Sequence, residues 1–284
     1  MKTIATINFK GGVGKTTITW CLGDILSTYG ESKVLLFDLD AQMSLTQAIA
    51  LDAEGSASGK FDRWYNSSKE NNRTIFSVLN KHLESDLTTF HPDNGFVYRL
   101  KQNYHFVPST EHLYWLELEN PDPGKGKFFI KNLLGRIANS ASLPTYDYVL
   151  FDCPPSFTIL SYSVLTSCDL VLIPFNPDFF AAKGVELLIA GLRHSIQPHP
   201  LPRLGVFANR VRTWRGPTRL AQAWIGDVGS ACEQAKASSG LDVEFMETWI
   251  PDRASLRDAI TNRRTPPELD QEFRSLWSEA ASML

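Results

Sequence analysis

The sequence predicts an α/β fold, with a doubly wound, mostly parallel twisted sheet and helices on both of its faces. Short apolar segments, such as residues 34–37 and 148–151, alternate with longer helix-like segments, as in sheets whose parallel strands are joined by crossover helices. Aspartates end two of these strands, and a glycine-rich turn follows the first strand. Because ligands bind at the carboxyl ends of the strands in such sheets, we expect these residues to share one site.

The individual elements follow from runs of apolar residues and from their spacing. The apolar runs predict strands at residues 4–7, 33–38, 104–108, 146–152, 169–174 and 203–210. The segments between them predict helices at residues 16–29, 74–83, 128–141, 179–196 and 217–237.

Residues 1–284 are expected to form a single domain, because no linker-like stretch or break in composition divides the chain. Residues 52–73 are rich in Gly, Ser, Asn, Asp, Lys and Glu and are predicted to be a polar surface insertion. Trp64 and Tyr65 are exceptions within it. We expect this pair to pin the insertion to the body of the domain, with partner docking as the alternative. A last helix is predicted around residues 268–282.

The composition limits the classes of function. A formal net charge of −3 excludes a globally basic nucleic-acid-binding protein but leaves local basic patches open. No apolar run approaches the ~18 residues that a membrane-spanning helix needs. The four cysteines have no paired C-x-x-C spacing, so we expect reduced, buried thiols in a cytoplasmic protein.

Residues 9–17, with the sequence FKGGVGKTT, lie between the first strand and the first helix. Backbone N–H groups of such a turn converge on phosphate at the positive end of the helix dipole. Lys15 then supplies a charge to the β- and γ-phosphates, and the Thr16 hydroxyl can ligate Mg²⁺. The predicted phosphate-binding residues are Lys10, Gly11, Gly12, Val13, Gly14, Lys15, Thr16 and Thr17.

This turn departs from the ordinary P-loop pattern in an informative way. Phe9 occupies the position of the first glycine, and a second lysine, Lys10, precedes the glycine pair. K-G-G-x-G-K-T-T is the deviant Walker A motif, and the chain here resembles the ParA/MinD family of ATPases. The resemblance implies that Lys10 reaches across a homodimer interface to the partner's ATP, so that Lys10, Lys15 and a carboxylate share the catalytic work.

The second strand ends in Asp38-Leu39-Asp40-Ala41-Gln42. This segment is similar to the family's D-x-D-P-Q switch, with Ala41 in place of the usual proline. The resemblance implies that Asp40 orients or activates the attacking water and that Asp38 supports the Mg²⁺ shell. An ordinary acidic cap at a strand end is the alternative for either aspartate.

Asp152 ends another hydrophobic strand and is followed by Cys153-Pro154-Pro155. This is the Walker B position, and the D-x-P-P ending resembles the family, so Asp152 is expected to hold Mg²⁺ through water together with Thr16. The resemblance further implies that Asn209, at a strand end, contacts adenine. It also implies that the loop bearing Pro251 and Asp252 closes over the base.

Five arginines and no acidic residue occur between residues 203 and 219, with Trp214 among them. Arginines interleaved with an aromatic residue favour a local phosphate-binding patch, and we predict DNA contacts from Arg212, Arg215 and Arg219. The alternative is a solvated basic face with one or two nucleotide contacts.

The resemblance implies a small, Soj-like ParA ATPase that uses ATP and Mg²⁺ and forms an ATP-dependent homodimer. Such a dimer binds DNA non-specifically, associates with the nucleoid, and positions a cargo with a ParB-like or cargo-adaptor protein that stimulates hydrolysis. A MinD-like membrane-cycling ATPase is the alternative, but the acidic C-terminal segment does not suit an anionic membrane. A reductase with a shared [4Fe–4S] cluster would need exposed thiolates, which Cys153 in a strand end does not offer.

Overall fold

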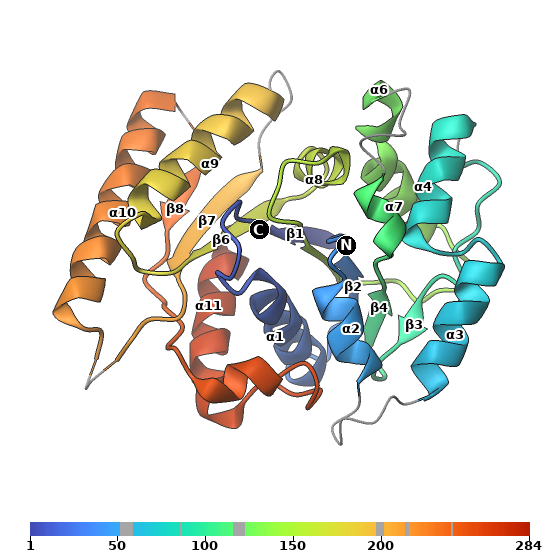
Figure 1. Cartoon of the computed structure of the whole chain (residues 1–284), viewed down its shortest axis with the longest axis horizontal. Helices are drawn as coiled ribbons and strands as arrows, with labels where there is room; N and C mark the ends of the chain where they lie inside the picture. Colours follow the sequence, from blue (N-terminus) through green and yellow to red (C-terminus); the bar gives the residue numbers. More distant parts are fainter. Residues whose placement is uncertain (52–58, 86, 116–122, 197–201, 214–215, 240) are drawn as a thin grey trace.

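The computed structural model describes residues 1–284 except 52–58, 86, 116–122, 197–201, 214–215 and 240. Its centre is an eight-stranded sheet in the order β3-β4-β2-β5-β1-β6-β7-β8 (Figure 1). Every paired strand is parallel to its neighbour except β3, which pairs antiparallel to β4 at one edge. The strands are β1 (Lys2–Thr6), β2 (Val34–Asp38), β3 (Tyr98–Arg99), β4 (Tyr104–Val107), β5 (Tyr148–Asp152), β6 (Leu170–Phe175), β7 (Arg203–Ala208) and β8 (Val243–Phe245).

Helices cover both faces of the sheet, as the sequence predicted. The described helices are α1 (Lys15–Thr28), α2 (Ser44–Ala50), α3 (Gly59–Glu70), α4 (Ile75–Glu84), α6 (Pro123–Gly126), α7 (Phe129–Ala138), α8 (Ile159–Leu165), α9 (Ala181–Ile196), α10 (Arg219–Ser239) and α11 (Asp270–Ser282). Three 3₁₀ helices join them, η1 (Glu111–Tyr114), η2 (Ala254–Asp258) and η3 (Pro267–Leu269).

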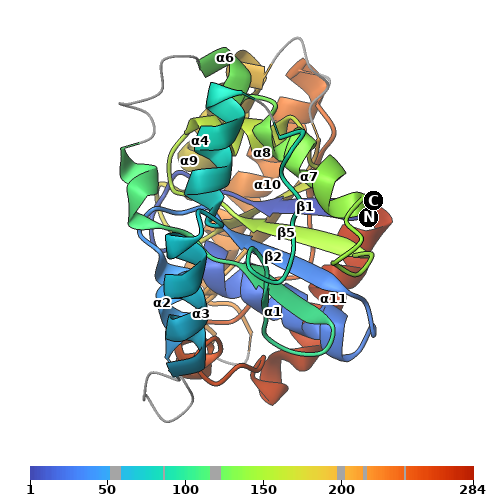
Figure 2. The same ribbon diagram turned by 90° about the vertical axis from the view of Figure 1, so that its right-hand side faces the viewer.

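The core forms two layers because successive strand residues point to opposite faces of the sheet. In β2, Leu35 and Phe37 pack into the layer of α4, α7, α8, α9 and α10, whereas Val34 and Leu36 pack into the layer of α1, α2, α3 and α11. Figure 2 shows α1 and α11 together on one side of the sheet and α4, α7 and α8 on the other. These two apolar layers make β1, β2 and β5 buried along their length, apart from Lys2 and Tyr148 at their starts.

The segment at residues 52–73, predicted as a polar surface insertion, contains a helix that was not predicted from the sequence. Residues 59–70 form helix α3, and residues 52–58 lie outside the described residues. The apolar side chains of α3, although few, recur at the i, i+3 and i+4 spacing of one helix face, which Phe61, Trp64 and Tyr65 occupy. Tyr65 donates a hydrogen bond to the Ser109 carbonyl oxygen at 2.7 Å, and Phe61 stacks on Tyr65. The Trp64-Tyr65 pair therefore joins α3 to the body of the domain, Trp64 by donating to the Asn94 carbonyl oxygen and Tyr65 through Ser109.

The C-terminal segment forms α11, within the range where the sequence predicted a helix. Phe273, Leu276 and Ala280 of this helix are fully buried and belong to the same core layer as α1. The end of the chain is also held at the start of the sheet, because Lys2 Nζ donates to the Leu284 carbonyl oxygen at 2.6 Å. The apolar face of α11 is thus used for packing against the domain.

Strand register decides which polar residues meet. Asp38 and Asp152 are register partners on the neighbouring strands β2 and β5, and Thr6 is the partner of Asp152 on β1. The phosphate-loop sequence follows β1 directly. The loop and the two carboxylates therefore lie at one edge of the sheet, at its carboxyl ends.

Candidate functional site

The glycine-rich turn has the backbone conformation of an anion-binding loop. Gly12 (φ 74°) and Gly14 (φ 88°) adopt left-handed angles that L side chains rarely accept. A Cβ on Gly14 would also collide with the side-chain amide of Asn209. Gly14 is the N-cap of α1, and none of the side chains that the structure describes caps the first turn of this helix. The N–H groups of this turn therefore remain available for phosphate.

Lys15 is buried beneath this turn and held by the backbone. Its Nζ donates to the carbonyl oxygens of Asn8 at 3.0 Å and Lys10 at 3.4 Å. Burial lowers the pKa of Lys15, while the Asp152 and Asp40 carboxylates act in the opposite direction. The ammonium group is thus positioned in advance, at the position where the motif places the β- and γ-phosphates.

The two strand-end carboxylates have different surroundings. Asp38 Oδ2 accepts hydrogen bonds from the Thr46 backbone N–H at 2.9 Å and the Thr46 hydroxyl at 2.7 Å, and Oδ1 accepts one from the Asp40 N–H at 3.1 Å. Both carboxylate oxygens of Asp152 are buried and have no hydrogen-bond partner among the described residues. Asp38 therefore anchors the segment that carries Asp40, whereas Asp152 remains available to another ligand.

Burial raises the pKa of both carboxyl groups. It raises the pKa of Asp38 to about 7, although the donors from Thr46 and the Asp40 backbone lower it. Burial, together with the nearby charge of Asp38, raises the pKa of Asp152 well above its ordinary value, against the effect of the Thr16 hydroxyl and Lys15. Two buried carboxylates without enough compensating charge suit a bound cation. The donor set of carboxylate and hydroxyl oxygen fits Mg²⁺.

Asp40 lies just outside this buried pair, on the loop that leads to α2. Its Oδ1 accepts the Gln42 N–H at 2.9 Å, and its carbonyl oxygen accepts the Ser109 hydroxyl at 2.7 Å. Its side chain is only partly buried. The loop is therefore fixed on both sides, while the carboxylate keeps access to solvent.

Lys10 is turned toward its own chain. Its Nζ forms an ion pair with Asp178, with the two side chains 44% and 37% exposed. The Lys10 backbone N–H donates to Asn8 Oδ1 at 2.9 Å. Asn8 in turn donates to the Pro174 carbonyl oxygen at 2.9 Å, which ties the loop to β6. The Lys10 side chain is thus held by Asp178, just after β6, and the Lys10 backbone is connected to β6 through Asn8.

The residues expected to hold the base lie at the other end of the loop. Asn209 Nδ2 donates to the Val13 carbonyl oxygen at 2.7 Å, while its buried Oδ1 has no partner among the described residues. Pro251 forms a parallel bridge to Val211, and the Asp252 N–H donates to the Val211 carbonyl oxygen at 2.9 Å. A small pocket lies between these segments and is lined by Gly14, Thr17, Ile18, Asn209, Arg210, Asp252, Arg253, Leu256 and Arg257.

Three residues of this site, Asn8, Thr46 and Asp178, were not singled out by sequence reasoning, and Arg210 was counted only among the five arginines between residues 203 and 219. Arg210 Nη1 donates to the Gly12 carbonyl oxygen at 2.7 Å, across the phosphate loop. Its position directly after Asn209 was a usable signal, as was Asp178 in the N-P-D sequence after β6. Thr46 carried no signal, because its role depends on how α2 packs against β2.

The predicted DNA-binding arginines are only partly described. Arg212 and Arg219 are exposed, and Arg219 is the first residue of α10. Arg215 and Trp214 lie outside the described residues. Arg212 lines a hollow of about 670 Å³ together with Arg210 and Arg257, next to the small pocket lined by Asn209 and Asp252. The arginines near the site are thus gathered at its β7 side.

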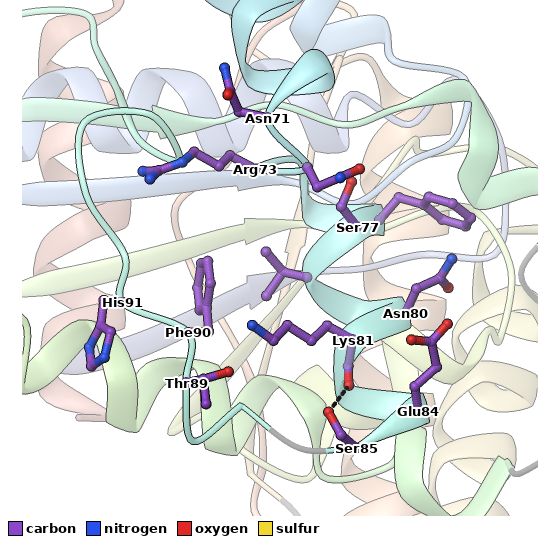
Figure 3. A pocket seen from close by; sticks show the side chains of 13 residues that line it. Asn71, Arg73, Ser77, Asn80, Lys81, Glu84, Ser85, Thr89, Phe90 and His91 are labelled. Carbon is purple, nitrogen blue, oxygen red and sulfur yellow. Dashed lines mark hydrogen bonds between the residues drawn. The ribbon is translucent and has the colours of Figure 1, made fainter.

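A larger hollow lies elsewhere, beside α4. It has a volume of about 840 Å³, and Figure 3 shows Arg73 and Lys81 among its labelled side chains, with Phe90 and His91 on the facing segment. Arg73 is already paired with Asp93. None of the phosphate-loop residues or strand-end carboxylates lines this hollow. It is therefore separate from the site described above.

These features together define the P-loop class of nucleotide-binding proteins. They are the parallel sheet, the loop with two left-handed glycines before α1, the buried Lys15, and the Asp152 carboxylate on the strand next to β1, which has no hydrogen-bond partner among the described residues. Comparison with known proteins narrows this class. A family profile described as an AAA domain matches residues 1–199.

Two curated relatives carry partition names. A ParA family protein of Chlamydia pneumoniae is 31% identical over 212 residues, covering 72% of this chain and 71% of the relative. The chromosome-partitioning ATPase Soj of Treponema pallidum is 30% identical over 190 residues, covering 66% of this chain and 62% of the relative. The chain therefore belongs to the ParA/MinD family of P-loop ATPases and is similar to Soj.

Solved structures agree on the fold. A putative plasmid partition protein of Borrelia burgdorferi bound to AMPPNP has a TM-score of 0.69 at 20% identity, covering 100% of this chain and 99% of that chain. The ParA protein of pNOB8, bound to nonspecific DNA, has a TM-score of 0.70 at 22% identity and covers 99% of both chains. At these identities the likeness is one of fold.

Proposed function

We propose that residues 1–284 act as one ParA-like ATPase domain that forms an ATP-dependent sandwich dimer, binds DNA non-specifically and positions a cargo. The observation that carries this proposal is a second lysine, Lys10, beside an otherwise complete phosphate loop. Lys15 already serves the loop of its own chain, held by two carbonyl oxygens at 3.0 and 3.4 Å. The Lys10 backbone belongs to this arrangement, but its side chain points away from it to Asp178 and would be free to serve another chain once it leaves Asp178.

The site supports binding of ATP with Mg²⁺. The loop from Lys10 to Thr17 would hold the phosphates, and Thr16 and Asp152 would hold the metal ion. Asp38 would support the shell of the metal ion by fixing the segment that carries Asp40. When bound, the metal ion neutralises charge that develops on the phosphate oxygens. Asn209, Pro251 and Asp252 would enclose the base. The buried, unpartnered oxygens of Asp152 and Asn209 support these assignments.

Asp40 would orient the attacking water. Its loop is fixed by Asp38 and Ser109, whereas its carboxylate remains partly exposed. A carboxylate held in this way can accept a proton or a hydrogen bond from water without binding the nucleotide itself. Hydrolysis would then return the dimer to monomers, so the rate of hydrolysis would set the lifetime of the ATP-bound dimer.

Non-specific DNA would bind through Arg212, Arg215 and Arg219. A monomer offers few phosphate contacts, whereas a two-fold dimer doubles them along one duplex, so ATP binding should raise DNA affinity. The DNA-bound ParA of the same fold supports this choice of ligand. A ParB-like or cargo-adaptor protein would stimulate hydrolysis; a role in partition is the named role of one relative, a chromosome-partitioning ATPase. The protein would then be cytoplasmic and nucleoid-associated while ATP is bound.

The buried apolar face of α11 favours DNA over a membrane, and buried Cys153 disfavours an iron–sulfur cluster. The apolar face of α11 is buried in the domain, so this helix has no free apolar face for lipid. Across the ranges that the structure describes, none of the helices combines the length and apolarity that a bilayer span requires. Cys153 is fully buried and burial raises its pKa well above the ordinary value, which does not suit a shared cluster.

Co-sedimentation tests the proposal. The protein is mixed with DNA or with anionic liposomes, in the presence of ATP, of ADP or of no nucleotide. We expect pelleting with DNA in ATP alone, and longer retention for Asp40→Ala, which should bind ATP but not reset. Binding to liposomes instead of DNA would replace the proposal with the membrane-cycling one. Rapid hydrolysis by Asp40→Ala would move the water-orienting role to another residue.

A further inference from the structure

Two successive carbonyl oxygens of the phosphate loop are held by the two residues that directly follow β7. Arg210 Nη1 donates to the Gly12 carbonyl oxygen at 2.7 Å, and Asn209 Nδ2 donates to the Val13 carbonyl oxygen at 2.7 Å. Asn176, just after β6, adds a second donor to the Gly12 carbonyl oxygen at 3.4 Å. The loop is therefore held from the side of β6 and β7, although it follows β1 in the chain.

These contacts also set the direction of two N–H groups of the loop. In a planar trans peptide, the carbonyl group of one residue and the N–H group of the next point in opposite directions. The bonds to the Gly12 and Val13 carbonyl oxygens therefore direct the N–H groups of Val13 and Gly14 away from Arg210 and Asn209. Among the described residues, neither N–H group donates to another protein group. Both stay available for phosphate, while the carbonyl oxygens, which would repel it, are directed elsewhere.

Arg210 has an uncommon backbone conformation for its residue type. Its φ of 56° lies in the left-handed region, which residues other than glycine rarely adopt. The residues on both sides are fixed by strands, because the Asn209 N–H donates to the Phe175 carbonyl oxygen at 2.7 Å and the Val211 N–H donates to the Ile250 carbonyl oxygen at 3.0 Å. Such conformations persist where the surrounding structure holds them, and they cluster at functional sites.

Arg210 differs in its contacts from the other arginines between residues 203 and 219. Arg203, at the opposite end of β7, pairs with Asp242 and donates to the Met283 carbonyl oxygen at 2.9 Å. Arg212 and Arg219 are exposed. Arg210 is the one described arginine of this range that donates to the phosphate loop, and it also lines the small pocket next to that loop. Its position thus belongs to the nucleotide site.

We propose that Arg210 is a positioning residue of this site, which holds the Gly12 carbonyl group so that the phosphate loop has its anion-binding conformation before a nucleotide arrives. The inference rests on the proposed function, because it assigns a further residue to the ATP site. The guanidinium acts on the loop and not on the phosphates. A loop that is already ordered loses less conformational entropy when it binds, so Arg210 raises the affinity for nucleotide.

The first experiment measures ADP affinity by calorimetry, which requires neither dimerisation nor hydrolysis. We expect Arg210→Ala to bind ADP roughly tenfold more weakly than the wild type, as for loss of a charged donor to a carbonyl group. Arg210→Lys keeps a charged donor and should recover part of this loss. Arg203→Ala is the matched control, since it removes an arginine of the same strand together with its bond to a carbonyl oxygen. It should bind ADP like the wild type.

A comparison of two substitutions separates positioning from a general structural role. Arg210→Gly removes the same side chain as Arg210→Ala but suits the left-handed backbone. It should therefore be more stable than Arg210→Ala in denaturant unfolding, yet bind ADP just as weakly. Recovery of ADP affinity in Arg210→Gly would overturn the inference, since affinity would then follow stability alone.

Salt separates positioning from direct contact with phosphate. The ratio of the ADP dissociation constants of Arg210→Ala and wild type should be the same at low and at high salt, because the bond to Gly12 does not involve the charge of the phosphates. A ratio that falls toward one as salt rises would overturn the inference and place the guanidinium on the phosphates.

NMR spectra of the nucleotide-free protein test the loop itself. The amide signals of Val13 and Gly14 should shift in Arg210→Ala and stay in place in Arg203→Ala. Unchanged signals in Arg210→Ala would overturn the inference, whether or not the protein binds nucleotide.

The outcomes also separate this inference from the proposed function. If the wild type binds neither ADP nor ATP, the proposed function fails. If the wild type binds ADP and Arg210→Ala binds it equally well, the inference about Arg210 alone is wrong. Equal ADP binding together with weaker DNA binding would likewise overturn it and assign Arg210 to the DNA-binding arginines.

Discussion

Two parts of the same sheet edge hold their charged groups in opposite ways. At the centre, where β1, β2 and β5 end, Lys15, Asp38 and Asp152 are buried and are surrounded by groups of their own chain. On the flank beyond β6, Asp178, Arg212 and Arg219 are partly or fully exposed. Buried charges need partners in fixed positions, whereas exposed charges exchange partners at little cost. The comparison suggests that the centre binds the nucleotide within one chain and that the flank depends on a second molecule.

The largest expected effect concerns the centre. Lys15→Ala removes a buried charge aimed at the phosphates, so ATP hydrolysis should fall by about 100-fold or more, with nucleotide-dependent dimerisation lost. Thr16→Ala should share the dimerisation defect because it removes a metal ligand. Lys183→Ala on α9, which removes an exposed lysine paired with Glu186, serves as the control. Normal nucleotide affinity in Lys15→Ala would overturn the assignment of the phosphate loop.

The second prediction concerns Lys10, whose side chain pairs with Asp178 on the flank. It tests whether Lys10 acts in the nucleotide site of the partner chain. Lys10→Ala and Asp40→Ala chains should each be inactive alone, because each dimer then has two defective sites. A mixed dimer should regain about half of the wild-type hydrolysis, since one of its sites receives Lys10 from the partner and retains its own Asp40. Steady-state hydrolysis against mixing ratio measures this. An inactive mixture would show that Lys10 serves its own chain.

The third prediction tests how tightly the loop is built without nucleotide. Gly14→Ala combines a left-handed backbone with a collision at Asn209, so the free energy of unfolding should fall by about 1–3 kcal/mol. Gly11→Ala is the matched control, because an added Cβ there meets no atom within 4 Å. Denaturant unfolding of the nucleotide-free protein gives both values. Equal stability of the two variants would contradict the described loop conformation.

The smallest expected effect per residue lies on the flank. Replacing Arg212, Arg215 and Arg219 by alanine should weaken binding to all DNA sequences alike and flatten its salt dependence. The slope of log affinity against log salt should lose roughly 0.9 for each phosphate contact removed. ATP binding should persist, because the three arginines lie outside the nucleotide motifs. Lys131→Ala, an exposed lysine on α7, is the control. An unchanged slope in the triple variant would exclude this patch.

The sequence by itself was sufficient for the fold class and for the positions of the residues that meet where β1, β2 and β5 end. The strands are buried on both faces, so β1, β2 and β5 appear as apolar runs, and Asp38 and Asp152 follow from their positions at the strand ends. The phosphate loop is equally local, since its glycines, Lys15 and Thr16 lie within a few residues of one another. A function that depends on adjacent residues is encoded by their order.

Other features required the tertiary structure because they join distant parts of the chain. Helix α3 was not predicted, because the packing of its aromatic side chains depends on a contact of Tyr65 with Ser109, 44 positions further along. The Lys10–Asp178 pair spans 168 positions, and the contact of Arg210 with Gly12 spans 198. Although Asp178 and Arg210 each lie at a recognisable position, nothing in the sequence indicates which distant residue either of them contacts. The contacts exist because the parallel sheet places β1 beside β6 and β6 beside β7, which brings the loops that follow these strands to one edge.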